Sequence, residues 1–405
     1  MSAQAPSAPV DAITGIAAAR FGVYLHFPYC LSKCPYCDFA STVVPRIPED
    51  RYTGAVLSEL ALRLAETPSL AAREVQSIFL GGGTPSLWSP GHVERVLSGI
   101  AARLPVARGA EVTLEANPNA ADASRFAGFR SAGVNRLSIG VQSFDASVLR
   151  ALGREHDGAT AKRAFEAARR AGFENLSMDF IYGVHGQRLE QVESDARRAG
   201  SLHPEHLSAY ALTLDREVLA EEVPLARQLA RKEIALPSDE ETLAMATAIR
   251  EIYAEHGLLR YEISNYARAG FHSRHNTLYW TGGEYLALGA GATGHLRTPS
   301  ESFRYSNHRS AERYLDSIER QQLPEASRES LGDRELFAER LAMGLRLTSG
   351  IDLQAICENF QQPFTPRRDE AERLVAGGFA RRQDGRYALT DSGADLHTEI
   401  AARLM

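Results

Sequence analysis

Between residues 21 and 214, six short apolar runs alternate with longer segments of helical pattern, and this alternation limits the fold more than any other feature. Apolar, β-branched runs of this length are typical of buried parallel strands. The helical segments place apolar residues three and four positions apart, which suits crossover helices on a parallel sheet. The predicted strands are Val23–Phe27, Val75–Leu80, Glu111–Ala116, Arg136–Val141, Leu176–Ile181 and His206–Leu212, and the clearest helices are Arg51–Leu64, Pro90–Leu104 and Thr160–Ala171.

Six consecutive strand–helix units predict an α/β fold with a barrel-like or doubly wound core. After the core, the stretch Glu217–Glu241 predicts a surface helix and a connection, and Glu240–His256 predicts an amphipathic helix. From about Leu323 the pattern changes to helices and a hairpin with Asp384-Gly385 at its turn, which is typical of a small winged-helix-like domain. We therefore predict a disordered tail over 1–20, the core and its extension over 21–320, and a C-terminal domain over 321–405.

The charge of the chain argues against a polyanionic partner. The formal net charge is −6, and residues 325–405 contain 14 acidic residues, 11 arginines and no lysine. A winged helix that binds nucleic acid carries a basic face, and this one lacks it. We expect the C-terminal domain to pack against the core or to act as a lid, and we expect no nucleic-acid partner.

The cysteine count indicates a reducing compartment. Only four cysteines occur, three of them between residues 30 and 37, unlike the dispersed pairs of a secreted disulfide scaffold. The first twenty residues contain no basic run followed by an apolar core, and no stretch approaches the roughly 20 apolar residues of a membrane span. These features predict a cytoplasmic protein.

Three of the cysteines, Cys30, Cys34 and Cys37, follow the first predicted strand, at the edge where βα loops build binding sites. A structural zinc ion needs a fourth ligand, and Cys357 is far away in the chain, so a closed zinc site is the weaker interpretation. A [4Fe-4S] cluster can take three thiolates and leave one iron open. Such an iron could chelate the adjacent amine and carboxylate of a small molecule and bring its sulfonium within electron-transfer reach.

A glycine-rich turn, Gly81-Gly82-Gly83-Thr84-Pro85-Ser86, ends the second predicted strand. Glycines there let backbone groups approach a ligand that any Cβ would exclude, and exposed backbone oxygens could hold the amino group of that ligand. The same residues could equally form a tight βα turn with no ligand. The cysteine loop just before the turn favours the binding role.

Polar residues follow three further strands. Glu115 could accept hydrogen bonds from ribose hydroxyls or an ammonium group, and Arg154 is suited to a carboxylate. Gln142 and Asp179 occupy similar places near the ends of the fourth and fifth strands. Each alone is more often a cap or a helix partner, but together we expect them to ring one barrel mouth.

The motif CxxxCxxC after a first strand, followed by the glycine turn, resembles the radical S-adenosyl-L-methionine (SAM) superfamily. From Tyr24 to its end, the chain resembles the anaerobic coproporphyrinogen III oxidase-like (HemN/HemW) branch. That resemblance implies a partial (β/α)6 TIM-like radical SAM barrel with a small C-terminal HemN-type domain, and a [4Fe-4S] cluster held by Cys30, Cys34 and Cys37. It further implies contacts to SAM or the cluster from Tyr24, Tyr36, Gly82, Gly83, Thr84, Glu115, Gln142, Arg154 and Asp179.

Two features favour the haem chaperones of this branch over its oxygen-independent coproporphyrinogen III dehydrogenase. The dehydrogenase carries a fourth cysteine two residues after the third, where this chain has Phe39. The segment from His275 to Trp280 is similar to the chaperones' HNxxYW signature, with His275, Tyr279 and Trp280 as candidates for contact with haem. The structural alternative is a core or cap histidine with two aromatic residues sealing the barrel. Cys357 reads as a buried small hydrophobe.

The expected function is therefore a haem chaperone that delivers haem to apo-haemoproteins such as respiratory enzymes, with an electron donor for its cluster. The alternative from the enzyme class is oxidative decarboxylation of coproporphyrinogen III to protoporphyrinogen IX. A regulatory protein that binds nucleic acid through the winged domain is a third hypothesis, which the acidic balance disfavours. Homodimerisation, peripheral membrane contact and turnover of SAM stay open.

Overall fold

The computed structural model describes residues 20–118, 123–214 and 223–405. The tail predicted over 1–20 lies outside the described residues except for Arg20, and so does the start of the polar stretch after residue 217. None of the described helices is both long and apolar enough to cross a lipid bilayer.

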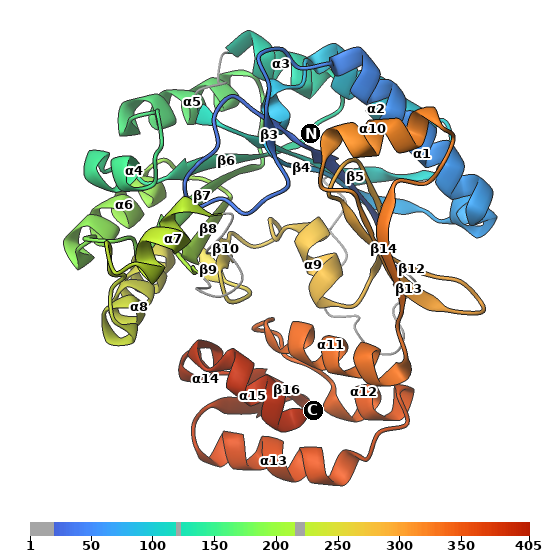
Figure 1. Ribbon diagram of the computed structural model, residues 1–405. Helices are drawn as coiled ribbons and strands as arrows, with labels where there is room; N and C mark the ends of the chain where they lie inside the picture. Colours follow the sequence, from blue (N-terminus) through green and yellow to red (C-terminus); the bar gives the residue numbers. More distant parts are fainter. Residues whose placement is uncertain (1–19, 119–122, 215–222) are drawn as a thin grey trace, which may run out of the picture.

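All six predicted strands are present, and they pair in parallel in chain order, which confirms the α/β core. Alternate side chains point outwards to the helices, among them Val23, Leu114, Ile139 and Met178, all fully buried. Figure 1 shows the strands as a curved sheet with helices along its outer side. The strands are β1 (Phe21–Phe27), β4 (Val75–Gly82), β5 (Val106–Ala116), β6 (Arg136–Gln142), β7 (Leu176–Tyr182) and β8 (His206–Ala211).

Helices connect consecutive strands, and the three clearest predictions are confirmed. In α5, for example, Ala161, Ala164, Phe165 and Ala168 are buried at the spacing of one helix face. Asp157 caps the same helix by accepting the N–H of Thr160. The connecting elements are α1 (Glu49–Glu66), η1 (Pro68–Ala72), η2 (Pro85–Leu87), α2 (Pro90–Ala101), α3 (Ala123–Ser131), α4 (Ala146–Ala151), α5 (Gly158–Arg170), α6 (Leu189–Ser201), α7 (Pro224–Ala230) and α8 (Asp239–Glu255).

The sheet extends beyond the six strands at both edges. β11 pairs in parallel with β1, antiparallel β12, β13 and β14 follow it, and antiparallel β10 and β9 extend the other edge beyond β8. The sheet curls without closing, as a partial barrel does (Figure 1). The added elements are β9 (Leu259–Arg260), β10 (Asn265–Ala267), β11 (Glu284–Leu288), β12 (Thr293–Arg297), β13 (Ser302–Asn307), α10 (Ala311–Glu319) and β14 (Glu325–Ser330).

A short helix, α9 (Arg274–Trp280), lies across the amino ends of the parallel strands. The carboxylate of Glu111, on β5, accepts the backbone N–H groups of Arg274 at 3.0 Å and His275 at 3.1 Å. A negative charge at the start of a helix is favourable. Figure 1 shows α9 between the sheet and the C-terminal elements, so the helix forms a floor beneath the barrel.

The C-terminal elements have a hydrophobic core of their own, which includes Phe337, Leu341, Ile356 and Leu374. The predicted hairpin is confirmed, with Asp384-Gly385 at its turn, both at positive φ. The elements are α11 (Asp333–Leu345), α12 (Leu353–Asn359), α13 (Phe364–Ala376), β15 (Ala380–Gln383), β16 (Arg386–Leu389), α14 (Asp391–Asp395) and α15 (His397–Leu404).

The predicted boundary at residue 321 falls before β14, and β14 is hydrogen-bonded to β13 in the large sheet. Residues 325–330 thus belong with the extension, and we propose that the small domain begins after Ser330. The polar sequence of β14 hides its strand character, because five of its six residues are exposed and no apolar alternation marks it.

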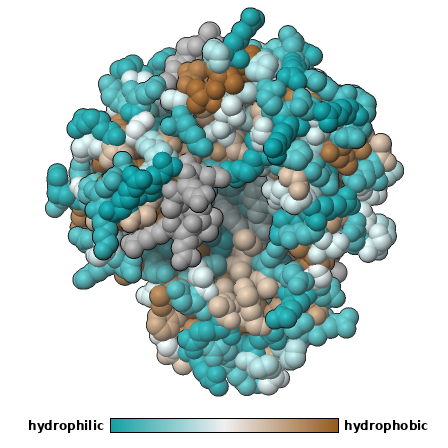
Figure 2. Space-filling view, in the orientation of Figure 1, coloured by the Kyte–Doolittle hydropathy of each residue, from teal (hydrophilic) through white to brown (hydrophobic). Residues whose placement is uncertain are grey.

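Most of the face seen in Figure 2 is hydrophilic, and one apolar patch lies near its top. That region corresponds in Figure 1 to β3 (Thr42–Val43) and the loop before it, which starts after β2 (Tyr29–Cys30). In that loop and strand, Leu31, Phe39 and Val43 are exposed to 65%, 58% and 51%. The cysteine loop therefore carries apolar side chains into solvent.

A buried ion-pair network fastens the extension to the barrel. The carboxylate of Glu59, on α1, is fully buried and accepts hydrogen bonds from the Gly289 amide (2.8 Å), Asn307 (2.8 Å) and the Tyr314 hydroxyl (2.9 Å). Arg63, one helical turn later and also buried, pairs with Glu59 and donates to Asn307. One carboxylate thus joins α1 to the segment after β11, to β13 and to α10.

We predict that Glu59→Ala lowers the free energy of unfolding by about 3 to 5 kcal/mol, because it breaks the buried pair with Arg63 and leaves the donors of Gly289, Asn307 and Tyr314 without their acceptor. The matched control is Glu312→Ala, which breaks the exposed pair with Arg51 and should cost less than about 1 kcal/mol. Urea titrations of the three proteins measure both effects. Equal costs for the two variants would mean that the network does not fasten the extension.

Candidate functional site

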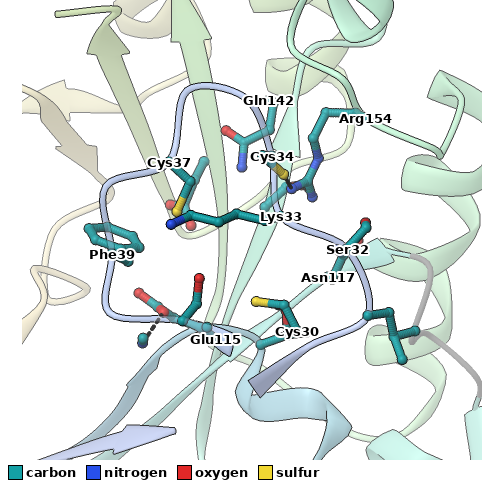
Figure 3. A pocket seen from close by; sticks show the side chains of 18 of the residues that line it. Cys30, Ser32, Lys33, Cys34, Cys37, Phe39, Glu115, Asn117, Gln142 and Arg154 are labelled. Atoms are coloured by element: carbon teal, nitrogen blue, oxygen red, sulfur yellow. Dashed lines mark hydrogen bonds between the residues drawn. The ribbon is translucent and has the colours of Figure 1, made fainter. Parts of the chain in front are cut away.

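The cysteine loop lies at the carboxyl ends of the parallel strands, where it was predicted. Cys30, Cys34 and Cys37 line one cavity of about 410 Å³, together with residues from β4, β5, β6, β7 and β8. Figure 3 shows the three cysteines along the loop, with Gln142 and Arg154 facing them from the barrel. The loop brings the three thiols to one cavity, as the spacing predicted.

The three cysteines form no disulfide and are partly buried. Thr84 donates its hydroxyl to the Cys30 sulfur at 3.5 Å, and Arg154 donates Nη1 to the Cys34 sulfur at 3.3 Å. Burial raises the pKa of the Cys30 and Cys37 thiols. Among the described residues, no three Cys, His, Asp or Glu side chains gather round one point as ligands of a single metal ion would. Three spaced thiols on one cavity wall fit a larger metal cluster with three protein ligands.

The glycine turn after β4 packs directly against the cysteine loop. Gly83 donates its N–H to the carbonyl of Phe27 at 2.7 Å, and Thr84 donates its N–H to the carbonyl of Tyr29 at 2.9 Å. A Cβ on Gly83 would lie 2.7 Å from the Tyr29 carbonyl oxygen and 3.0 Å from the Cys30 sulfur. Gly82 has a φ of +112°, which disfavours any side chain. Only glycine permits the turn to approach the cysteine loop this closely, so the glycines are required for the shape of the site.

The end of β6 is bent toward the cavity. Gln142 has a φ of +65°, an unusual conformation for a residue other than glycine, and the pairing of β6 with β7 shifts register just before it. Arg154 donates Nη2 to the carbonyl of Gly140 at 3.2 Å while Nη1 contacts the Cys34 sulfur. The predicted residues Gln142 and Arg154 therefore lie together beside the cysteine loop.

Two carboxyl groups occupy the inner wall of the cavity. Glu115 accepts the N–H of Gly82 at 3.2 Å, and Asp179 accepts the hydroxyl of Ser138 at 2.8 Å. Burial raises the pKa of Glu115 to about 8, and the negative charge of Asp179 adds to the shift. Burial also raises the pKa of Asp179. Both predicted acids reach the cavity, where their charge is unusually easy to neutralise.

The two predicted tyrosines occupy different places. Tyr36 lines the cysteine cavity. Tyr24 instead lines a second cavity of about 220 Å³ inside the barrel, and its hydroxyl lies 3.0 Å from Nδ1 of His26. His26 Nε2 in turn contacts the carbonyl oxygen of Ala40 at 2.8 Å. His26 thus links Tyr24 to the cysteine loop by hydrogen bonds.

The HNxxYW residues do not line the cysteine cavity. His275 is buried, and its ring nitrogens contact the hydroxyls of Ser77 at 2.9 Å and Tyr279 at 2.7 Å. Trp280 is buried in a separate cluster with Tyr261 and Leu347. Both imidazole nitrogens are engaged, so axial ligation of haem by His275 would require one of these contacts to break. The arrangement matches the structural alternative, and haem contact at His275, Tyr279 and Trp280 stays a prediction.

Several residues of the cavity were not singled out from the sequence. They include Lys33, Asn117, Ser138 and Tyr210. The signal that could have found Ser138 is strand alternation, because Arg136, Ser138, Gly140 and Gln142 share one face of β6. Reasoning from strand ends alone misses such interior positions.

We predict that Glu115→Gln stabilises the protein lacking cluster and SAM, and that the gain grows between about pH 5 and about pH 8. The pKa of Glu115 is about 8 in the folded protein and about 4.3 in the unfolded chain, so the folded state holds its proton more tightly. This contribution to stability is complete below about pH 4.3 and is lost as the pH rises to about 8. Melting temperatures measured across this range test the prediction.

Asp145→Asn is the control for this titration. Hydrogen bonds, chiefly from the Ser147 hydroxyl, lower the pKa of Asp145 to about 2, so its titration is complete below the tested range. The difference between Asp145→Asn and the unmodified protein should therefore not vary with pH. Parallel curves for Glu115→Gln as well would show that Glu115 ionises normally.

Comparison with known families agrees with this geometry. The model of the Radical SAM superfamily matches residues 24–199, which contain all three clustered cysteines and both cavity acids. The model of the HemN C-terminal domain matches residues 331–396. The first match runs from β1 into α6, and the second covers α11 to α14 of the small domain.

Relatives and a solved structure resemble two thirds or more of the chain. The heme chaperone HemW of Escherichia coli (strain K12) is 39% identical over 278 residues, 68% of this chain and 70% of the relative. The heme chaperone HemW of Bacillus subtilis (strain 168) is 31% identical over 383 residues, 93% of this chain and 97% of the relative. The structure of coproporphyrinogen III oxidase (HemN) from E. coli shares the fold, with a TM-score of 0.78, 21% identity, and coverage of 95% and 90% of the two chains. With its cysteine cavity and both domains matched, the chain belongs to the HemW family of radical SAM proteins.

Proposed function

We propose that the protein is a haem chaperone that binds a [4Fe-4S] cluster, SAM and haem, and delivers haem to apo-haemoproteins. The observation that carries the proposal is a cavity lined by three cysteine thiols, with Phe39 where the dehydrogenase has a further cysteine. The printed name of the relatives, heme chaperone, supports the transfer of this function to the present chain.

Cys30, Cys34 and Cys37 would hold the cluster. A bound cluster with one open iron would supply the electron needed to cleave the SAM sulfonium, if SAM is cleaved at all. Beside the cluster, the backbone of Gly82, Gly83 and Thr84 would contact the amino group of SAM. Arg154 suits the SAM carboxylate, Glu115 suits ribose hydroxyls or the ammonium group, and the remaining assigned residues are Tyr24, Tyr36, Gln142 and Asp179.

Phe39 favours the chaperone over the dehydrogenase. It is 58% exposed and lines the mouth of the cysteine cavity, so this position offers an apolar ring and no thiol. With the exposed Leu31, which lines the same cavity, it offers an apolar surface that suits contact with a porphyrin face. The chemistry of this surface thus agrees with haem as cargo.

The proposed setting is the cytoplasm, with apo-haemoproteins such as respiratory enzymes as acceptors and a separate protein as electron donor to the cluster. The small domain has an acidic balance, which disfavours a role in nucleic-acid binding. A transfer assay with an apo-haemoprotein tests the acceptor.

The experiment is anaerobic reconstitution of the cluster followed by two assays on the same sample. We expect haem titration, followed by absorbance, to reach a fixed stoichiometry, and the bound haem to pass to an apo-haemoprotein. Incubation with coproporphyrinogen III, SAM and a reductant should give no protoporphyrinogen IX. Failure to bind or transfer haem would overturn the chaperone proposal, and formation of protoporphyrinogen would establish the dehydrogenase instead.

We predict that each of Cys30→Ser, Cys34→Ser and Cys37→Ser loses the reconstituted cluster, since each removes one of three thiolate ligands. Iron and sulfide content per chain, with the visible absorbance of the cluster, measures the loss. Cys357→Ser is the control and should keep the full content, because Cys357 is buried in the core of the small domain. A cluster that survived all three loop substitutions would refute the assignment.

A further inference from the structure

The lumen of the barrel contains a second cavity below the cysteine cavity. It has a volume of about 220 Å³ and is floored by His275, Asn276 and Tyr279 of α9. The two cavities share Glu115, Ser138, Asp179 and Tyr210 among their lining residues, so the lower one is reached from the mouth. At about 30 Å³ per water molecule, it has room for roughly seven waters or a small organic group.

One guanidinium group dominates the chemistry of this lumen. Arg136, at the start of β6, lines the cavity, is only 2% exposed, and its Nε–H finds no acceptor within the described part of the chain. Its nearest acidic neighbours are otherwise engaged. Asp179 already accepts the hydroxyls of Ser138 at 2.8 Å and Ser177 at 3.4 Å, and Glu115 accepts the N–H of Gly82.

A buried guanidinium whose Nε–H has no acceptor is costly unless an acceptor meets it. The two acids that share the space repel an anion less than ordinary carboxylates would. Burial raises the pKa of both Glu115 and Asp179, so the passage from the mouth carries less negative charge than two ordinary carboxylates would. Tyr24 and Tyr279 line the same space, each with its hydroxyl paired to a histidine ring, and add no charge to it.

We propose that the lumen is a binding site for a carboxylate, held by the planar guanidinium of Arg136 and reached through the mouth of the barrel. A carboxylate matches the fork of guanidinium donors and carries one negative charge, where a phosphate would bury more. The volume admits a short acid or one carboxylate arm of a larger molecule, and it is too small for a porphyrin ring. The inference rests on the lumen alone and does not depend on haem delivery.

The test uses the reconstituted full-length protein with sodium propionate as the probe and propionamide, its neutral counterpart of the same shape, as the control. Ionic strength is held constant with sodium chloride. Saturation-transfer NMR and the rise in melting temperature should both saturate with propionate and not with propionamide. No saturable effect of propionate, or an equal effect of propionamide, would overturn the proposal.

Variants at the guanidinium give the residue-level test. Arg136→Met should weaken propionate binding at least about tenfold, because a charge-assisted hydrogen bond is lost. Arg150→Met, which removes an exposed arginine of α4, should leave it unchanged. If Arg136→Met does not fold, Arg136→Lys is the deciding variant. It keeps the positive charge but loses the planar pair of guanidinium donors, so it should bind propionate several-fold more weakly. Unchanged affinity in the folded Arg136 variant would refute the site.

A competition experiment identifies the source of the carboxylate. Haem and its dimethyl ester, in which both propionates are blocked, are titrated with and without propionate. Competition by propionate, with weaker binding of the ester and of haem to Arg136→Met, would assign the site to a porphyrin arm. Simultaneous binding of propionate and haem would support a separate carboxylic acid. The propionate result is read without haem, so failure of haem delivery and failure of this site are distinguishable.

Discussion

Two backbone hydrogen bonds determine where the chemistry of this protein can take place. Gly83 and Thr84 donate to the carbonyls of Phe27 and Tyr29, and these contacts fix the glycine turn against the base of the cysteine loop. The approach leaves no room for a Cβ on Gly83. Because the loop begins at this contact, the three thiols face the carboxyl ends of the strands. This position of the loop places the thiols in the same cavity as Gln142, Arg154, Glu115 and Asp179.

Inside the barrel, the six parallel strands separate two environments. Their outward side chains form an apolar core with the helices, while the inward positions of β5, β6, β7 and β8 are largely polar. Small barrels usually fill their interior with packed side chains. Here the lumen borders Arg136, Asp179 and Tyr210 and is not filled by side chains. The protein therefore lacks part of the packing energy of an apolar interior and has a chamber that solvent and ligands can enter.

Much of this arrangement could be predicted from the sequence, and the exceptions have physical causes. The six parallel strands of the core, three of the crossover helices and the cysteine loop have strong local signals and were found, whereas β11, which is parallel to β1, was not. β14 escaped because an exposed edge strand needs no apolar alternation. Tyr24 lies beside His26, which contacts the cysteine loop, and spacing along a strand does not reveal such an intermediary; its contact with SAM or the cluster stays a prediction. Arg136 was not recognised as a binding residue, because the sequence shows only an arginine at the start of a strand and does not show that its side chain lines the lumen.

The floor helix α9 also touches the small domain. Arg340 of α11 donates to the carbonyl of Trp280, and the guanidinium of Arg346 makes two hydrogen bonds to the buried carboxylate of Glu262 in the segment before α9. The lower end of the barrel is therefore closed by a helix that two domains hold jointly. A protein bound to α11 would therefore lie one short helix away from the lumen of the barrel, on the side opposite the cysteine cavity.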